Sequence, residues 1–201
     1  GATFGHGLSG APEMIIVKER DPGGNNWMVG HDAVGWTKYL AWDTNASVVT
    51  SSARWNDTAP SSTLVTLGND TGINATGATY VAYCFRSVPG VCKVGSYVGN
   101  NNADGSYVHT GFKPAFVMTK TTSSGAWGIM DSAREPSNPV IKRLFPSSNS
   151  AEDEDGEQMD FLSKGFKLRK TGGFNNNNQT YIYLAMAEIS GNGTLPPIYG
   201  R

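Results

Sequence analysis

The feature that most constrains the fold is an internal repeat. Pro12–Lys18 (PEMIIVK) aligns without a gap on Pro114–Lys120 (PAFVMTK), and both keep the proline, three central apolar residues and the closing lysine. Three further segments follow in the same order, with Asn45 opposite Asn149. They are Asn26–Val29 with Ala126–Ile129, Lys38–Leu40 with Lys142–Leu144, and Thr79–Tyr83 with Thr180–Leu184. Collinear matches at a spacing of about 100 residues indicate two diverged copies of one unit.

Each copy has the pattern of short strands joined by turns. An apolar strand follows the proline, then come a Trp-bearing strand, a Lys-x-Leu strand, a variable loop and a closing Thr-Tyr strand. Turn signals such as DPGG at 21–24 and GGFNNNN at 172–178 separate them. The expected fold is an all-β sandwich of the jelly-roll or lectin-like kind, built from two internally duplicated halves.

The repeat also predicts the domain organisation. Residues 1–90 form the first β-rich repeat, residues 91–190 form a second repeat packed with the first into one domain, and residues 191–201 form a C-terminal tail. The closing strands Tyr80–Phe85 and Tyr181–Ala187 are apolar on both faces, so both are expected at the centres of their sheets. If equivalent strands meet about a pseudo-twofold axis, the halves form one sandwich. Features shared by both copies are best explained by folding, and function is expected where the copies differ.

The charge of the chain excludes several partners. The formal net charge is -1 and only 16% of the residues are charged. Such a chain lacks the attraction that nucleic acids and anionic membranes require. No apolar run of about 18 residues is present, so membrane insertion is not expected.

Cys84 and Cys92 are the only cysteines, which leaves neither a disulfide framework nor a four-cysteine zinc site. Cys84 lies in an apolar run, as a free buried thiol would. A bridge between the two stays open, because they flank one short connection.

The sequence offers carboxylates but no catalytic arrangement. The acids on or beside predicted strands are Asp32, Asp43, Asp57 and Asp131. Glycoside hydrolysis needs two carboxylates in one cleft, and the sequence singles out no pair. Asp32 and Asp131 end equivalent Trp strands, which favours a turn or strand-end role. No catalytic residue and no enzyme activity are predicted.

An acidic run, EDEDGE at 152–157, could attract Ca²⁺ through Asp153, Asp155 and Glu157. It lacks the alternating oxygen ligands of an EF-hand. A solvated loop is favoured, and no cofactor is expected.

One stretch combines aromatic rings with amides and carboxylates, as sugar sites do. The candidate glycan-binding residues are Trp36, Tyr39, Trp55, Asp43, Asn45, Asn56 and Asp57. Alternation with period 2 puts Trp36, Leu40 and Trp42 on one face and Tyr39 on the other. Trp42 beside Leu40 is expected to be buried, which leaves Tyr39 or Trp55 as the exposed ring.

Several ordered motifs resemble one family. They include FGHGLSGAPEMIIVK at 4–18, ATYVAYCF at 78–85, VGSYVGNNNADGSYVHTGFKPAFVMTK at 94–120 and TYIYLAMAE at 180–188. Together they resemble an uncharacterised C-terminal domain family of marine and cyanobacterial tailed-phage structural proteins. The resemblance implies a virion or extracellular module, such as a tail fibre or capsid decoration. It also implies partners: copies of itself, with a homotrimer expected, other virion proteins, and a host-surface glycan.

Two other functions stay open. One is a self-assembling extracellular filament or surface-layer subunit without a ligand. The other is a carbohydrate-active hydrolase, which would need paired acids in a cleft.

Overall fold

A computed structural model describes residues 1–21, 23–154, 156 and 158–187. The strands of the first half are β1 (Thr3–Gly5), β2 (Met14–Asp21), β3 (Met28–His31), β4 (Lys38–Ala41), β5 (Val49–Thr50), β6 (Leu64–Thr66) and β7 (Thr79–Phe85). Those of the second half are β8 (Cys92–Val98), β9 (Tyr107–His109), β10 (Pro114–Thr121), β11 (Trp127–Asp131), β12 (Met159–Leu162), β13 (Gly165–Leu168) and β14 (Thr180–Ala187). The described helices are the single turns α1 (Ser52–Trp55), α2 (Thr71–Asn74), η1 (Asp32–Val34) and η2 (Gly173–Asn175). The predicted all-β class is confirmed. The predicted tail at 191–201 lies outside the described residues.

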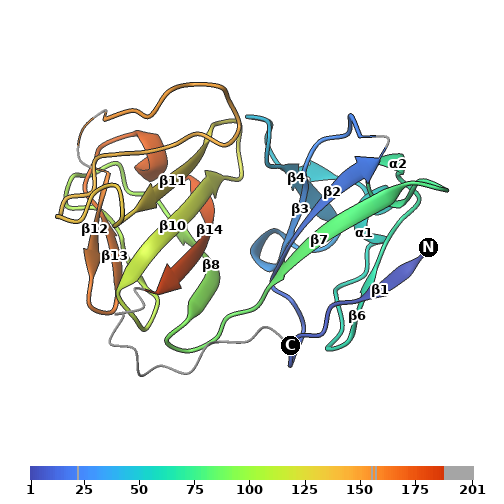
Figure 1. Cartoon of the computed structure of the whole chain (residues 1–201). Coiled ribbons are helices and arrows are strands. Elements are labelled where there is room, and N and C mark those ends of the chain that lie inside the picture. Colours follow the sequence, from blue (N-terminus) through green and yellow to red (C-terminus); the bar gives the residue numbers. More distant parts are fainter. Residues whose placement is uncertain (22, 155, 157, 188–201) are drawn as a thin grey trace.

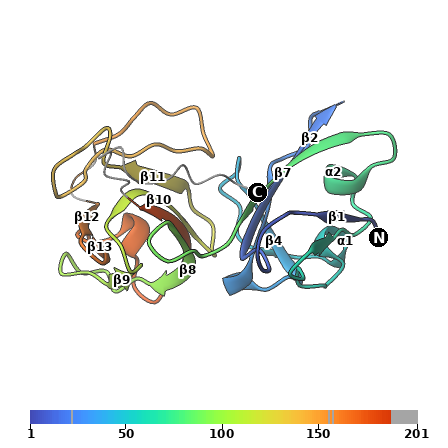
Figure 2. The same ribbon diagram turned by 60° about the horizontal axis from the view of Figure 1, so that its bottom comes forward.

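Each half contributes one main sheet (Figure 1). The first sheet has the strand order β5-β4-β3-β2-β7 and the second has the order β11-β10-β14-β8, with antiparallel pairing throughout. Two smaller sheets, β1-β6 and β12-β13-β9, accompany them. Figure 2 shows the two halves side by side, joined by the segment between β7 and β8.

The two main sheets share one pairing register. Strand pairs that the sequence alignment makes equivalent lie opposite one another in both sheets. These pairs are Ile16–Val29 with Met118–Ile129, Ile16–Tyr83 with Met118–Leu184, and Val29–Leu40 with Ile129–Leu144. A slip of one residue would turn every side chain of a strand to the other face of the sheet. The shared register therefore keeps aligned residues on the same face in both sheets. The descent of both halves from one ancestral unit stays a prediction.

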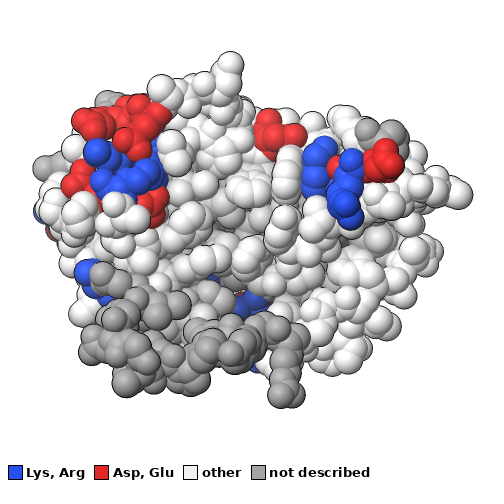
Figure 3. Space-filling view, viewed as in Figure 1, with Lys and Arg blue, Asp and Glu red and all other residues white. Residues whose placement is uncertain are grey.

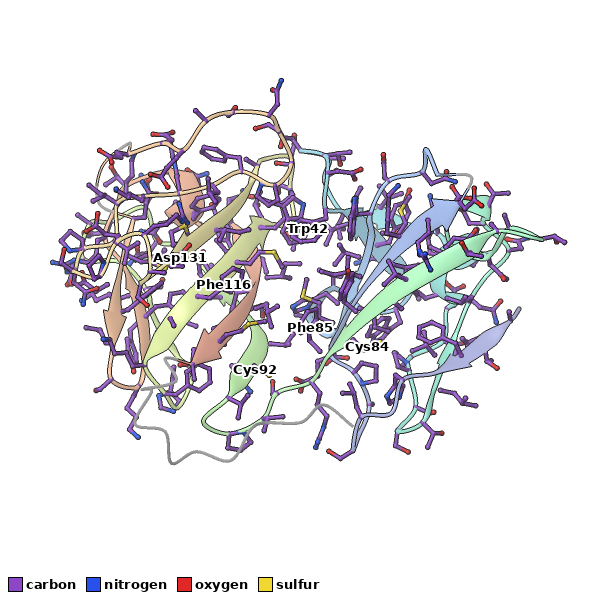
Figure 4. The ribbon with its side chains drawn as sticks, in the orientation of Figure 1. Trp42, Cys84, Phe85, Cys92, Phe116 and Asp131 are labelled. Atoms are coloured by element: carbon purple, nitrogen blue, oxygen red, sulfur yellow. The ribbon has the colours of Figure 1, made fainter. Side chains whose placement is uncertain are left out.

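The sheets pack face to face across a core to which both halves contribute. Ile16 and Leu40 of the first half and Met118 and Leu184 of the second belong to one buried cluster. Trp42, Phe85 and Phe116 pack against this cluster, and Figure 4 shows them at the boundary between the halves. Because neighbouring residues of a strand point to opposite faces, each sheet also has an outer core of its own. The halves therefore share one core and do not pack as two independent domains.

Backbone and side-chain bonds add to this interface. Trp127 Nε1 donates to the Ala41 carbonyl at 2.9 Å, and Val48 N donates to the Thr122 carbonyl at 2.9 Å. These two bonds pair polar groups of one half with those of the other, as buried polar groups require.

The closing strands differ from each other. β14 lies between β10 and β8 and its residues 181–185 are buried, as predicted. β7 is an edge strand, and Tyr83 at its middle is 47% exposed, so the central position predicted for it is wrong. The physical reason is β8, which covers the outer side of β14, whereas no described strand covers β7.

The two cysteines are free thiols in different sheets, Cys84 in β7 and Cys92 in β8 (Figure 4). Cys92 Sγ donates to the Arg86 carbonyl at 2.9 Å. The structure therefore contains no bridge between them.

Candidate functional site at the edge of β7

A cavity of about 520 Å³ lies beside the open edge of β7. We call it the β7 groove. Its wall on the sheet side consists of Tyr80, Ala82 and Cys84, and its opposite wall includes Phe4 and His6 beside β1. The buried floor consists of Val17, Leu67 and Ile73, and the end of α2 closes it with Asn74 and Ala75.

Local hydrogen bonds fix the shape of the groove. The Tyr80 hydroxyl accepts from Ala75 N at 2.8 Å and donates to the Thr71 carbonyl at 2.7 Å. This clamp holds α2 against β7. The Asp70 side chain caps α2 by accepting from Gly72 N at 2.7 Å, which satisfies a free backbone donor of the first turn. The groove is therefore shaped by the fold itself.

The groups that line the groove favour binding over catalysis. Burial raises the pKa of Cys84 to about 11, so its thiol is protonated at neutral pH and is a poor nucleophile. His6 Nδ1 accepts from Leu8 N at 3.1 Å, which leaves Nε2 to donate to the Ser61 carbonyl at 3.2 Å. Both ring nitrogens therefore have a structural role. No carboxylate from the described residues lines the groove.

The two tryptophans of the predicted glycan site are core residues. Trp36 is 7% exposed and Trp55 is fully buried, and their rings meet edge to face at 5.8 Å. The expectation that Trp55 presents an exposed ring is wrong. Trp55 ends the helical turn α1, and Trp36 lies in the turn before β4, so strand alternation governs neither. A Cβ added at Gly30 would come within 2.5 Å of the Trp36 ring, so the glycine makes room for the pair.

The other predicted glycan residues lie at separate places. The Tyr39 ring is half-buried, with the Arg54 guanidinium 4.6 Å from its centroid. Asp43 accepts from the Trp27 backbone N at 3.2 Å, and the Asn45 carbonyl accepts from Gly125 N at 2.9 Å at the boundary between the halves. Asn56 and Asp57 are exposed and occupy the left-handed region with φ of 51° and 49°, where they end α1.

An aromatic cleft that sequence reasoning missed lies near Asp43. Its lining is Trp27, Trp42, Asp43 and Pro146, around a cavity of about 250 Å³ between the halves. Trp27 stacks on Tyr83 with ring centroids 6.4 Å apart and an interplanar angle of 21°. Trp42, predicted to be buried beside Leu40, packs against the shared core but is only partly buried. The shared Trp strand predicts a folding role for Trp27 and Trp127 alike, but only Trp127 is fully buried.

The acidic run does not form a metal site within the described residues. Asp153 pairs with Arg143 at 2.7 Å, and Glu152 pairs with Arg134 at 2.8 Å. Figure 3 shows this mixed acidic and basic patch on the second half. Asp155 and Glu157 lie outside the described residues. In the described part of the chain, no three His, Cys, Asp or Glu side chains gather as a metal site would require.

The remaining acids have structural partners. Asp131 accepts from Arg134 Nε at 2.7 Å and from its backbone N at 2.9 Å, and Asp32 accepts from Trp36 Nε1 at 3.3 Å. Both follow or end their Trp strands, in the strand-end position that the alignment predicts. Of the four acids considered for hydrolysis, Asp43 alone lines a described cavity.

The fold and the groove define the class of this protein as an all-β module with an apolar groove at a strand edge. The chain belongs to the family described as "Domain of unknown function (DUF7483)", which matches residues 1–190. No curated protein and no solved structure matches the chain. Among the described residues, no helix has the length and apolar character that crossing a bilayer would need.

Proposed function

We propose that this chain is a non-catalytic binding module of a larger protein assembly, and that the β7 groove is its contact site. The observation that carries the proposal is a cavity of about 520 Å³, lined mostly by apolar side chains, beside a strand edge that no described strand covers. Pockets of this size that combine apolar walls with a small number of placed polar groups bind side chains or small ligands. An unpaired strand edge is a template for pairing with another chain.

The assembly that fits best is a virion appendage, such as a tail fibre or a capsid decoration. The motif resemblance supports this setting. A trimer of the chain and an extracellular or virion location belong to the same proposal. Its rivals are a ligand-free filament subunit and a carbohydrate-active hydrolase. The groove does not support the hydrolase, because no described carboxylate lines it.

A titration with p-cresol tests whether the groove binds aromatic groups. In a methyl-labelled chain, the methyl signals of Val17, Leu67 and Ile73 should shift and saturate at millimolar p-cresol. Ala82→Phe should abolish the shifts, because the new ring lies over the groove, and an aromatic residue, Tyr183, occupies the aligned position of β14. Ser96→Phe on the exposed edge strand β8 is the matched control and should leave them unchanged. Unshifted groove methyls, or turnover of glycoside substrates, would contradict the proposal.

A second candidate function is glycan binding at the aromatic cleft. Trp27, Trp42 and Asp43 line it, Tyr83 stacks on Trp27, and Trp42 Nε1 has no hydrogen-bond partner among the described residues. Sugar rings pack on aromatic faces and their hydroxyls need polar partners. A glycan array should give hits that Trp27→Ala removes and Tyr39→Ala retains. An array without hits would leave the cleft with a packing role only.

A further inference from the structure

The open edge of β7 carries backbone groups that point away from the sheet. Asp32 N donates to the Glu13 carbonyl at 2.8 Å, so odd residues of β2 bond toward β3 and even residues bond toward β7. The register then turns Val81 and Tyr83 toward β2. The N–H and C=O groups of Tyr80, Ala82 and Cys84 consequently face the open side.

The second half shows what covers the equivalent edge. β8 pairs antiparallel with β14 along seven residue pairs, from Thr180–Val98 to Met186–Cys92. Tyr181, Tyr183 and Ala185 of β14 align with the outward residues of β7. β14 has a partner strand on this edge, and the outer edge of β7 has none among the described residues.

The side chain of Tyr97 fills the position that is a cavity in the first half. Tyr97 lies in β8, is 8% exposed and stacks on Tyr181 with ring centroids 5.0 Å apart. Its hydroxyl donates to the Phe174 carbonyl at 2.8 Å and lies 3.1 Å from Thr119 Oγ1. By the alignment, Thr119 corresponds to Val17 and Phe174 to Ile73, which are floor residues of the β7 groove.

Two further contacts recur in both halves, the second with its acceptor shifted by one residue. The Tyr181 hydroxyl accepts from Asn176 N at 3.1 Å and donates to the Gly173 carbonyl at 3.0 Å, as Tyr80 does with Ala75 and Thr71. The surroundings of the Tyr97 side chain therefore occur in both halves. Among the described residues, an aromatic ring fills this position in the second half and none fills it in the first.

The matching loop contacts are missing in the first half. Asn175 Nδ2 donates to the Asn102 carbonyl at 2.8 Å, and its Oδ1 accepts from Asn100 N at 3.0 Å, which anchors the loop after β8. Its counterpart Asn74 makes one side-chain hydrogen bond within the described residues, to the Gly68 carbonyl at 2.7 Å. Asn74 thus has an amide oxygen available for an incoming segment.

We propose that the edge of β7 and the β7 groove accept an extended strand of a partner protein, which pairs antiparallel with β7 and places an aromatic side chain in the groove. This inference rests on the proposed function and names the partner class. The backbone of the strand adds to the sheet, and the ring opposite Tyr80 takes the place that Tyr97 has on β14. Strand addition of this kind combines main-chain bonds for affinity with pockets for specificity.

A second copy of this chain fits the groove less well. If two β7 strands paired about Ala82, Cys84 would lie opposite Tyr80, at the position where the groove requires an aromatic ring. The aromatic ring of β8, Tyr97, is already buried in its own half. The occupant is therefore a strand with its own free aromatic residue.

The test uses the full chain and a synthetic peptide with the sequence of residues 91–101 carrying Cys92→Ser. Calorimetry should show 1:1 binding. Replacing the tyrosine of the peptide by alanine should weaken it at least about tenfold, because a buried aromatic anchor is lost. Replacing it by phenylalanine should weaken binding less than alanine does, because the buried ring is kept and only the hydrogen bond of the hydroxyl is lost.

Protein variants locate the site. Ala82→Pro removes an outward N–H and should abolish binding, while Ser96→Pro removes an outward N–H from the edge strand β8 and should retain it. Amide exchange of Ala82 and Cys84 in the unmodified chain gives the same information if a proline variant does not fold.

Three outcomes would overturn the inference. They are no peptide binding at millimolar concentration, binding that Ala82→Pro does not affect, and a dimer through β7 that excludes the peptide. If the peptide fails while p-cresol still shifts the groove methyls, the strand proposal is lost and the proposed binding function stands. If both fail, the proposed function is lost as well.

Discussion

Trp127 offers the sharpest test of the packing between the halves. Its side chain is 1% exposed in the shared core, and its Nε1 donates to the buried Ala41 carbonyl at 2.9 Å. Trp127→Phe removes this bond and leaves the acceptor unpaired, which costs about 1 to 2 kcal/mol. The smaller ring leaves a void that costs about 1 kcal/mol more. The free energy of unfolding should fall by about 2 to 3 kcal/mol, and Tm by about 5 to 10 °C.

The matched control is Trp27→Phe. Trp27 occupies the aligned position in the first half but is only half-buried, so the loss should stay below about 1 kcal/mol. Urea unfolding followed by fluorescence and by far-UV circular dichroism measures both variants. The two probes should report one coincident transition, because the halves share a core. Equal losses in the two variants, or two separate transitions, would refute the packing described above.

Three further predictions concern buried groups. Burial lowers the pKa of His31 in the folded chain to about 4. As the pH falls from about 6.5, His31 is therefore protonated in the unfolded chain before it is protonated in the folded chain. The stability that depends on neutral His31 is therefore lost between about pH 6.5 and 4, by up to about 3 kcal/mol, and a urea series on His31→Gln should show a flatter profile. Burial also lowers the pKa of Lys120 to about 8, so stability should rise between about pH 8 and 10.5, and Lys120→Met should remove that rise. Gly30→Ala should cost about 1 to 3 kcal/mol in thermal unfolding, since its Cβ would meet Trp36 at 2.5 Å, whereas Gly5→Ala, whose nearest contact is 3.7 Å, should cost little.

The sequence predicted the strands well because their signals are local. Strand alternation and the proline before each first strand located β2 and β10. Residues that align in the sequence take equivalent places in the two sheets, as Ile16–Val29 and Met118–Ile129 show. The pattern of Tyr181–Ala187, which is apolar on both faces, placed β14 inside its sheet. These features depend on residues close together in the chain.

The position of β7 could not be predicted in this way. β7 and β14 have nearly the same apolar pattern, but β8 pairs with β14 and no described strand takes that place beside β7. The residues of β7 alone do not indicate whether such a neighbour is present. The same limit applied to Trp55, which is buried by a helical turn that strand alternation does not describe. The expectation that function lies where the copies differ now points to a specific place, the edge of β7, rather than to the stretch between Trp36 and Asp57.

Amide hydrogen exchange is the most direct test of the β7 groove as a contact site. In the chain alone, the outward amides of Ala82 and Cys84 should exchange quickly, and those of Tyr183 and Ala185, which are bonded to β8, should exchange slowly. Addition of the peptide of residues 91–101 carrying Cys92→Ser should protect Ala82 and Cys84 and leave the β14 amides unchanged. Unchanged exchange at Ala82 and Cys84 with the peptide in excess would contradict the account.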